Sequence, residues 1–392
     1  MRKITDGIGR LLWIYFLVNP FLDMISGAYI YIRCGSDYDL YSSMDVGVTP
    51  SLVVRMAMLL VFAAYILLKK DKMAILTAIG LAAAWVMSMV AEYMSFRTLG
   101  LAIDVQYFAK FCYNVAVLLV YDRLFTDSGL TREELFDKVQ RMLCIVSFIL
   151  AAGIVIPYIL DFGFYTYADR FGYRGFRGIY YSGNDITATI MLGLPVTLCK
   201  YVTLQGAPIR TRLFYGAAPT LSMLCLLVIG TKTAFAAVCI SLIFLLVYGI
   251  VRRRADSADR TLMMLLTVVV GVAASAALLS LLAGRSVLTT MLASLIGIGD
   301  AANESTKTLL LSGRQVRLAS NFSDYVAGGP LTWLFGLGRG SREATMEMDL
   351  FEVVFYYGVA GAAAMLWLYL KTGIGFVARF FKSFSLRAMG LF

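Results

Sequence analysis

Apolar stretches long enough to cross a lipid bilayer recur along almost the whole sequence, and they constrain its fold more than any other feature. A membrane-spanning α-helix needs ~20 apolar residues. Hydrophobic residues make up 60% of the 392 residues and charged residues only 15%, which excludes a single large soluble core. The sequence therefore predicts an all-α, polytopic integral membrane protein that forms a single membrane domain over residues 1–392. The apolar stretches occupy residues 11–32, 51–68, 73–91, 104–121, 142–160, 186–203, 213–229, 234–251, 261–283 and 350–370.

The two ends of the chain carry their own signals. The first apolar stretch lacks a small-residue cleavage site and contains Asn19, Pro20 and Asp23, so we expect it to be retained as the first span. Residues 386–392 resemble the start of a further span that stops in mid-pattern, as expected of a truncated sequence. The sequence thus predicts roughly 10 or 11 transmembrane helices.

The loops between the apolar stretches differ in charge, and this difference predicts their orientation. Basic residues gather at the N-terminus and in segments 69–72, 123–141, 200–212, 252–260 and 371–387, which fall on one side of successive spans. By the positive-inside rule, this side is the cytoplasm, so the N-terminus lies inside and the large polar loop 284–349 lies outside. The net charge of +10 reflects this bias, and we expect no nucleic-acid partner.

Residues 127–141 carry the signal of a helix start. Thr131 is followed three residues later by Glu134, which is the pattern of a capping box. Leucine, phenylalanine and valine follow among charged residues. The segment therefore predicts a capped amphipathic helix on the cytoplasmic face.

The chain contains no histidine and six cysteines, none of which forms a Cys-x-x-Cys pair. Histidine is the commonest metal ligand and a frequent general base. We therefore expect no metal site and no cofactor, and acid–base chemistry would have to use carboxylates, lysine or tyrosine.

Two groups of cations lie on the predicted outer side, each beside a span. Residues 170–184 alternate arginines, among them Arg174 and Arg177, with aromatic residues and glycines. Arginine binds phosphate oxygens in pairs, and Asn184 can cap the following helix, whose N-terminus also favours anions. Lys232 lies in a tight turn at residues 230–234, where a cation is costly without a partner. The alternative for both groups is an interfacial aromatic belt with snorkelling cations.

Two further groups lie in or beside the large polar loop. Arg314 and Arg317 follow a Ser-Gly pair, while Glu347 and Asp349 stand before the next span and Glu352 lies inside it. Taken alone, Arg314 and Arg317 also fit a solvated helix end. For the acids the alternative is helix capping, which explains Asp349 well and Glu352 poorly. Together, cations suit a pyrophosphate that leaves with extra charge, and carboxylates suit deprotonation of an attacking sugar hydroxyl.

In this order and spacing, the four groups resemble the motifs of the O-antigen ligase and O-antigen polymerase superfamily. Residues 177–180 (RGIY) with Asn184 and Ala188 are similar to the R-G-x-aromatic…N-x-x-A stretch, and residues 231–234 (TKTA) to the S-R/K-T-A turn. Residues 312–314 (SGR) with 330–331 (PL) and 336–338 (GLG) are similar to the S-G-R…P-L…G-x-G run of the large external loop. The acidic motif that opens the next span is matched by Glu347, Asp349, Gly358 and Gly361. The resemblance covers residues 165–370, and residues before it share only hydropathy.

The resemblance implies a metal-independent membrane glycosyltransferase in surface polysaccharide biosynthesis, whether of O-antigen, capsule or exopolysaccharide. Its implied partners are an undecaprenyl-pyrophosphate-linked saccharide donor, a glycan or cell-envelope acceptor, and the lipid bilayer. The implied location is the outer face of the bacterial inner or plasma membrane, in a multi-pass protein.

The resemblance also implies roles for particular residues. Lys232 and Arg314 would hold the pyrophosphate, and we place Arg177 and Arg317 with them. A second tier comprises Arg174, Asn184 and Arg339. Lipopolysaccharide ligases carry a histidine at the position of Glu347, and this chain has none. That departure favours a polymerase over a ligase, with Glu347 or Asp349 as the catalytic base.

Two other classes of protein are compatible with this sequence. A transporter or flippase for an anionic or lipid-linked substrate usually places charges at the bilayer midplane in repeated halves, and the sequence contains few such charges and no repeat. A membrane scaffold would leave the outer arginines unexplained. The sequence does not determine polymerase or ligase activity, the sugar and its linkage, the acceptor, or the oligomeric state.

Overall fold

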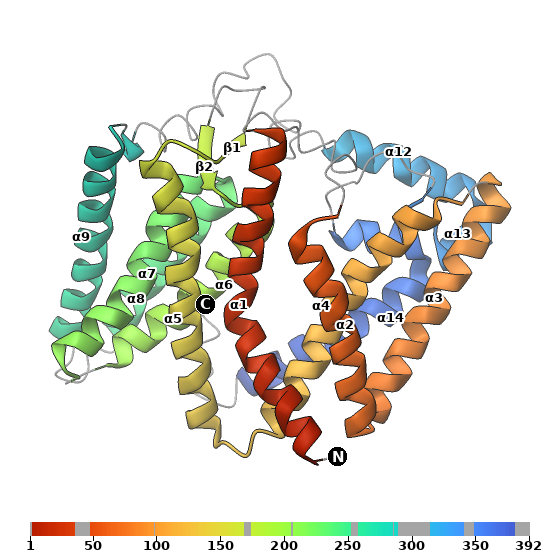
Figure 1. The fold of residues 1–392 in the computed structure, drawn as a ribbon, viewed down its shortest axis with the longest axis horizontal. Coiled ribbons are helices and arrows are strands. Elements are labelled where there is room, and N and C mark those ends of the chain that lie inside the picture. Colours follow the sequence, from red (N-terminus) through yellow and green to blue (C-terminus); the bar gives the residue numbers. More distant parts are fainter. Residues whose placement is uncertain are drawn as a thin grey trace. The chain divides into compact units, whose positions relative to one another are not determined.

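Helices make up almost all of the chain for which the structure, a computed structural model, gives a description (Figure 1). The described residues are 2–35, 48–97, 99–167, 174–204, 207–251, 258–284, 286–288, 314–340 and 349–380. Within them, nine helices are long and apolar enough to cross a membrane, which confirms the predicted all-α polytopic fold. They lie in α1 (Arg2–Cys34), α2 (Pro50–Lys69), α3 (Lys72–Phe96), α4 (Leu101–Thr126), α5 (Arg132–Ile159), α6 (Gly183–Thr203), α7 (Ile209–Ile229), α9 (Ala258–Ala283) and α14 (Asp349–Phe380).

The remaining predicted span, residues 234–251, lies in α8 (Lys232–Val251). Its described apolar part is shorter and ends at Ile243. All ten predicted spans therefore fall within helices, except that Leu160 follows the last residue of α5. The tail from residue 386 lies outside the described residues, as does most of the segment between α9 and residue 314.

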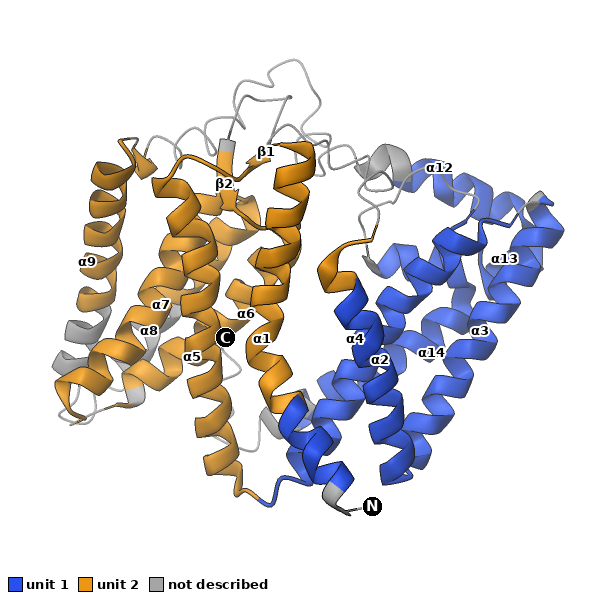
Figure 2. Cartoon of the chain, viewed as in Figure 1, with its two compact units in different colours: residues 1–11, 53–129, 301–378 blue, residues 12–52, 130–300, 379–392 orange. Residues whose placement is uncertain are grey.

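The chain divides into two compact units (Figure 2). Unit 1 contains residues 1–11, 53–129 and 301–378, and unit 2 contains residues 12–52, 130–300 and 379–392. Unit 1 is therefore built from both ends of the chain and unit 2 largely from its middle. The single domain expected over residues 1–392 stays a prediction.

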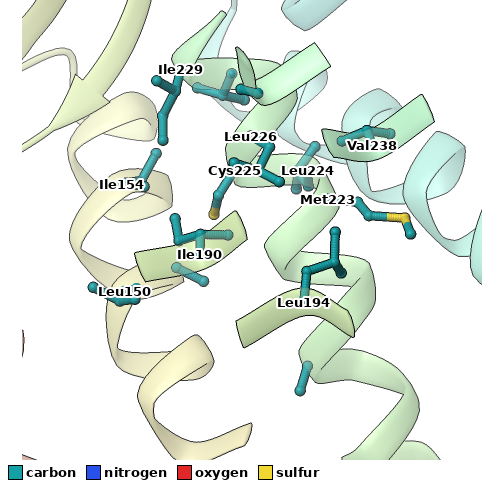
Figure 3. Close-up of a cluster of buried hydrophobic side chains, with 14 of the residues drawn as sticks. Leu150, Ile154, Ile190, Leu194, Met223, Leu224, Cys225, Leu226, Ile229 and Val238 are labelled. Atoms are coloured by element: carbon teal, nitrogen blue, oxygen red, sulfur yellow. The ribbon is translucent and has the colours of Figure 1, made fainter. Parts of the chain in front are cut away.

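Helix α7 forms the centre of unit 2, where it packs against α5, α6, α8 and α9. Apolar side chains of these helices, such as Leu150, Ile190 and Leu226, fill a common core (Figure 3). Gly216 allows α7 to approach α6 closely, because a Cβ there would come within 2.8 Å of the Tyr201 ring. Since helices in a bilayer associate through close packing, a small residue at this contact directly stabilises the pair.

The core of unit 1 is aromatic. Trp85 of α3 stacks on Phe108 of α4, with ring centroids 4.9 Å apart. Tyr107 of α4 meets Tyr356 of α14 edge-on at 5.5 Å. Such pairs each contribute about 0.5–1.5 kcal/mol beyond their buried area. They join α3 and α4 to a helix that lies far later in the chain.

Two short helices lie within the polar segment 284–349. α12 (Arg314–Ala327) is amphipathic: Leu318 and Tyr325 pack onto the core of unit 1, whereas Ser320 and Ser323 are exposed. α13 (Gly329–Phe335) follows it, and its Thr332 Oγ1 lies 3.4 Å from Ser95 Oγ near the end of α3. Both helices lie at the opposite end of unit 1 from the basic turn 69–72 (Figure 1). This is the arrangement that the charge bias of the loops predicts within this unit.

The helix start predicted near residue 131 is confirmed, but the separate amphipathic helix is not. The Thr131 side chain accepts a hydrogen bond from the Glu134 backbone, and the Glu134 carboxylate accepts one from the Thr131 backbone at 2.9 Å. The same helix then continues as the span α5, from Arg132 to Ile159. The sequence between the polar turns and the apolar stretch contains no glycine or proline that would end the helix there.

Candidate functional site

A β-hairpin, which the sequence did not predict, carries the first group of cations in unit 2. Strands β1 (Phe164–Tyr167) and β2 (Arg174–Gly178) pair antiparallel, with Tyr165 opposite Phe176. The Thr166 hydroxyl donates a 2.7 Å hydrogen bond to the Ile229 carbonyl at the end of α7. Gly175, at φ +63°, lies so close to this carbonyl that a Cβ would overlap it. The hairpin is therefore fixed to the C-terminal end of α7.

Gly178 fixes the other end of β2. Its φ of +66° belongs to the left-handed region, and a Cβ would overlap the Gly153 carbonyl of α5. The next residue, Ile179, donates its backbone N–H to the same carbonyl at 2.9 Å. A substitution at Gly178 would therefore combine backbone strain with a clash. The Arg-Gly pair of the motif thus has a physical basis: the glycine fixes the strand end that carries Arg177.

Arg177 is a buried cation that no carboxylate neutralises among the described residues. Its side chain is only 4% exposed, and its Nε has no hydrogen-bond partner there. The guanidinium carbon lies 5.4 Å from the centre of the Phe164 ring and 5.9 Å from that of Tyr181. Burial lowers the pKa of Arg177 to about 10, while Tyr181 opposes this shift. The group therefore stays charged at neutral pH in a setting where a bare charge is costly.

The side chain of Arg177 lies against the start of α6. A Cβ at Gly183, the first residue of this helix, would be 3.1 Å from Arg177 Cδ and 3.6 Å from Nη1. The N-cap is Ser182, which gives no side-chain hydrogen bond to the helix end and instead donates to Asp185 at 2.7 Å. Asn184 was expected to cap this helix; it instead lies exposed within the first turn. Arg177 and the helix N-terminus together form a setting for an anion.

The second cation group lies directly after the carbonyl that holds the hairpin. Gly230 ends α7 in the left-handed conformation, and Thr231 starts α8 by accepting a hydrogen bond from the Ala234 backbone at 3.2 Å. Lys232 is exposed in the first turn of α8. Because Thr166 and Gly175 both contact Ile229, the structure brings the hairpin and the Lys232 turn to the same end of unit 2.

Several other predicted site residues are only partly described. Arg174 belongs to β2, Arg314 and Arg317 lie in the first turns of α12, and Asp349 begins α14, but the side chains of all four are outside the description. Glu347 lies outside the described residues altogether. Their predicted roles stay predictions.

Unit 1 contains a separate polar centre that we define by four buried charged side chains. Glu92 of α3, Asp104 of α4, Glu352 of α14 and Arg339 are each less than 5% exposed. Asp104 and Glu92 both favour the charged form of Arg339, whereas burial lowers its pKa. The Arg339 guanidinium also lies 5.9 Å from the ring centres of Tyr107 and Tyr356. Unlike Arg177, Arg339 has carboxylates in its surroundings.

A break in α14 creates the acceptors for the loop that carries Arg339. Gly358 interrupts the helix with φ 65° and ψ −174°. The carbonyl of Phe355 accepts the backbone N–H of Leu337 at 2.7 Å, and that of Tyr356 accepts Gly338 at 3.1 Å. Ser88 adds a second donor to the Tyr356 carbonyl at 2.6 Å. Both carbonyls that the helix break frees from intrahelical bonding therefore still accept hydrogen bonds.

Sequence reasoning selected Arg339 and noted Glu352, but it missed Glu92 and Asp104. Glu92 follows one predicted apolar stretch and Asp104 begins the next, so both looked like ordinary residues at span ends. Two acids that flank one short connection between spans were the signal in the sequence. Their burial at 0% and 2% exposure is what distinguishes them.

These features define a polytopic membrane protein. In one unit, a buried arginine lies beside a helix N-terminus with no carboxylate to neutralise it among the described residues, and in the other a buried arginine lies among carboxylates. The profile of the family described as "O-antigen ligase like membrane protein" matches residues 5–286. Since the match covers more than half of the chain, the protein belongs to this family of surface-polysaccharide assembly enzymes. No curated protein and no solved structure matches the chain. The match includes the N-terminal third, where the motif resemblance was confined to hydropathy.

Proposed function

We propose that the protein is a glycosyltransferase that transfers or polymerises an undecaprenyl-pyrophosphate-linked oligosaccharide on the outer face of the cell membrane. The observation that carries this proposal is Arg177: a buried cation without a carboxylate among the described residues, held against the N-terminus of α6. A cation of this kind is stabilised by a bound anion, and a pyrophosphate has the matching charge and geometry. The family match supports the same class of substrate.

The reaction moves one glycosyl group and one proton. The oxygen of an acceptor hydroxyl forms a bond to the anomeric carbon of the donor sugar, and the bond from that carbon to the pyrophosphate oxygen breaks. Glu347, or Asp349 in its place, accepts the hydroxyl proton. Undecaprenyl pyrophosphate leaves with an additional negative charge, which Arg177 and Lys232 stabilise more strongly than the charge of the bound donor.

The remaining candidate residues take supporting roles in this proposal. Arg314 and Arg317 supply further cations from the start of α12, and Arg174 and Asn184 lie in the segments next to Arg177. The absence of a histidine in the chain favours a polymerase of repeat units over a lipopolysaccharide ligase. Arg339 has Asp104 and Glu92 to compensate its charge, which makes it a weaker pyrophosphate ligand than Arg177.

One observation favours the alternative of a transporter or flippase. Broken membrane helices such as α14 often line transport sites, where their free carbonyls bind ions or substrate. Here, however, the carbonyls of Phe355 and Tyr356 accept hydrogen bonds from Leu337 and Gly338. A transporter or flippase would move its substrate without transferring any glycosyl group. The following experiment measures glycosyl transfer and so distinguishes the two classes.

The test is glycan transfer in membranes supplied with lipid-linked repeat units. Arg177→Lys keeps a positive charge but loses the paired geometry, so we expect transfer to fall by about tenfold or more at equal membrane abundance. Arg210→Met, which removes an exposed arginine at the start of α7, serves as the control and should transfer normally. Normal transfer by Arg177→Lys would contradict the proposal.

A deletion strain distinguishes the two reactions. Loss of a polymerase leaves single repeat units attached to their final acceptor, whereas loss of a ligase leaves finished chains on the lipid carrier. We expect the first result. Glu347→Gln should abolish polymer formation, Asp349→Asn, which keeps an equally good capping oxygen, should have little effect on stability, and EDTA should have no effect. Inactivation by EDTA, together with loss of activity in both variants, would indicate a metal held by the two acids.

A further inference from the structure

The last two residues of the loop at residues 336–340 are held through their backbone by a single carboxylate oxygen. Asp104 Oδ1 accepts the backbone N–H of Arg339 and that of Gly340, each at 2.9 Å. Asp104 Oδ2 is buried without a hydrogen-bond partner among the described residues. The carboxylate therefore bonds to two consecutive N–H groups of a segment that lies 235 residues later in the chain. Charge-assisted hydrogen bonds of this kind are about twice as strong as neutral ones.

The other backbone donors of this loop are also bound. Gly336 donates to Thr332, Leu337 to Phe355, and Gly338 to Tyr356. All five consecutive N–H groups thus have a protein acceptor, and Asp104 supplies the acceptor for the last two. With each donor bound, the backbone at Arg339 is held in place, and with it the direction in which the side chain leaves the backbone.

Glycines make the close approach of Asp104 possible. A Cβ at Gly340 would overlap the Asp104 carboxylate, and one at Gly100, at the start of α4, would overlap Gly340. Gly338, at φ +69°, lies in the same way against the Glu92 carboxylate. The Gly-Leu-Gly-Arg-Gly sequence is therefore complementary in shape to the two acids, which also surround the Arg339 guanidinium with negative charge.

We propose that Asp104 is a positioning residue that acts through Arg339: it fixes the loop backbone and thereby orients the guanidinium between Tyr107 and Tyr356. The proposal rests on the proposed function only in assuming that Arg339 influences glycosyl transfer. It assigns a role to the N-terminal third of the chain, where the motifs gave none. Asp104 itself touches no substrate in this scheme, and its effect on catalysis follows from the placement of Arg339.

The first experiment needs no substrate. Arg339 is 4% exposed, so trypsin should not cleave after it in the detergent-solubilised full chain. Asp104→Ala removes the acceptor for two N–H groups and should make the bond after Arg339 cleavable, as measured by mass spectrometry of the fragments. Asp122→Ala changes an exposed aspartate on the same helix and should leave the bond protected. Continued protection of Arg339 in Asp104→Ala would overturn the proposal.

The second experiment tests whether Asp104 acts through Arg339. Misplacement of a positioned group can lower kcat/KM on the order of 100-fold, and we expect a loss approaching this in Asp104→Ala, with Asp104→Asn, which keeps an acceptor oxygen, retaining more activity. In an Arg339→Lys background, Asp104→Asn should cause little additional loss. Losses that multiply would show that Asp104 acts independently of Arg339 and would overturn the positioning role.

The two experiments also separate this inference from the proposed function. If wild-type protein transferred no glycan, the proposed function would fail. The trypsin measurement would still decide whether Asp104 fixes the loop.

Discussion

The two buried arginines allow a direct test, because removing them should lower stability to very different extents. Arg339→Met leaves Asp104 and Glu92 buried without their cation. Breaking a buried charge pair from one side typically costs about 3–5 kcal/mol. Arg177→Met instead removes a buried charge that has no carboxylate among the described residues.

The expected change for Arg177→Met follows from its two aromatic contacts. The loss of cation–π attraction to Phe164 and Tyr181 costs about 1–2 kcal/mol. This cost is offset because the variant no longer buries a charge for which the described residues supply no carboxylate. We therefore expect the free energy of unfolding to change by no more than about 1 kcal/mol, well below the loss in Arg339→Met.

The assay is thermal unfolding of the purified, detergent-solubilised protein, with and without inorganic pyrophosphate. Without pyrophosphate, Arg339→Met should unfold at a clearly lower temperature than Arg177→Met. A ligand at 100 times its Kd stabilises by about 2.7 kcal/mol, so pyrophosphate should raise the midpoint of wild type but not that of Arg177→Met. Equal destabilisation of both variants, or undiminished pyrophosphate stabilisation of Arg177→Met, would refute the reasoning.

Three other predictions concern topology, the broken helix and the helix cap. In a background without Cys34, a cysteine at Ser320 should react with a membrane-impermeant maleimide in intact cells and one at Ser257 should not; the opposite labelling would reverse the topology. Gly358→Ala should lower the unfolding temperature, because φ there is +65° and a Cβ would overlap the Leu334 carbonyl, whereas the unobstructed Gly375→Ala on the same helix should be neutral or slightly stabilising. Thr131→Ala should cost about 1 kcal/mol through loss of the capping box, and an unchanged melting midpoint would contradict that.

The spans and the helix start at Thr131 could be predicted from sequence because each depends on neighbouring residues. Apolar length alone marks a span, and the capping box lies within four residues. The same local rules failed to show that α5 continues from its cap into the membrane without a boundary. They also placed a cap at Asn184, two positions after Ser182, which is the N-cap of α6.

The site was less predictable because its contacts join distant segments. The hairpin is held by Ile229, more than 50 residues after its second strand, and nothing local marks residues 164–167 as a strand. Asp104 and Arg339 are 235 residues apart, and no periodicity links them. Motif spacing could select Arg177 for its chemistry, but only the structure shows that Arg339 lies among carboxylates whereas Arg177 has none among the described residues.

The construction of unit 1 from both ends of the chain has a consequence for biogenesis. Glu92 and Asp104 enter the membrane with α3 and α4, and the whole of α5 to α9 is synthesised before Arg339. The nascent chain therefore carries these two carboxylates, which lie near the ends of α3 and α4, through most of translation before their cation exists. A chain that ended before residue 336 would contain both acids without this arginine. The polar centre can therefore be completed only after the whole of unit 2's α5 to α9 has been made.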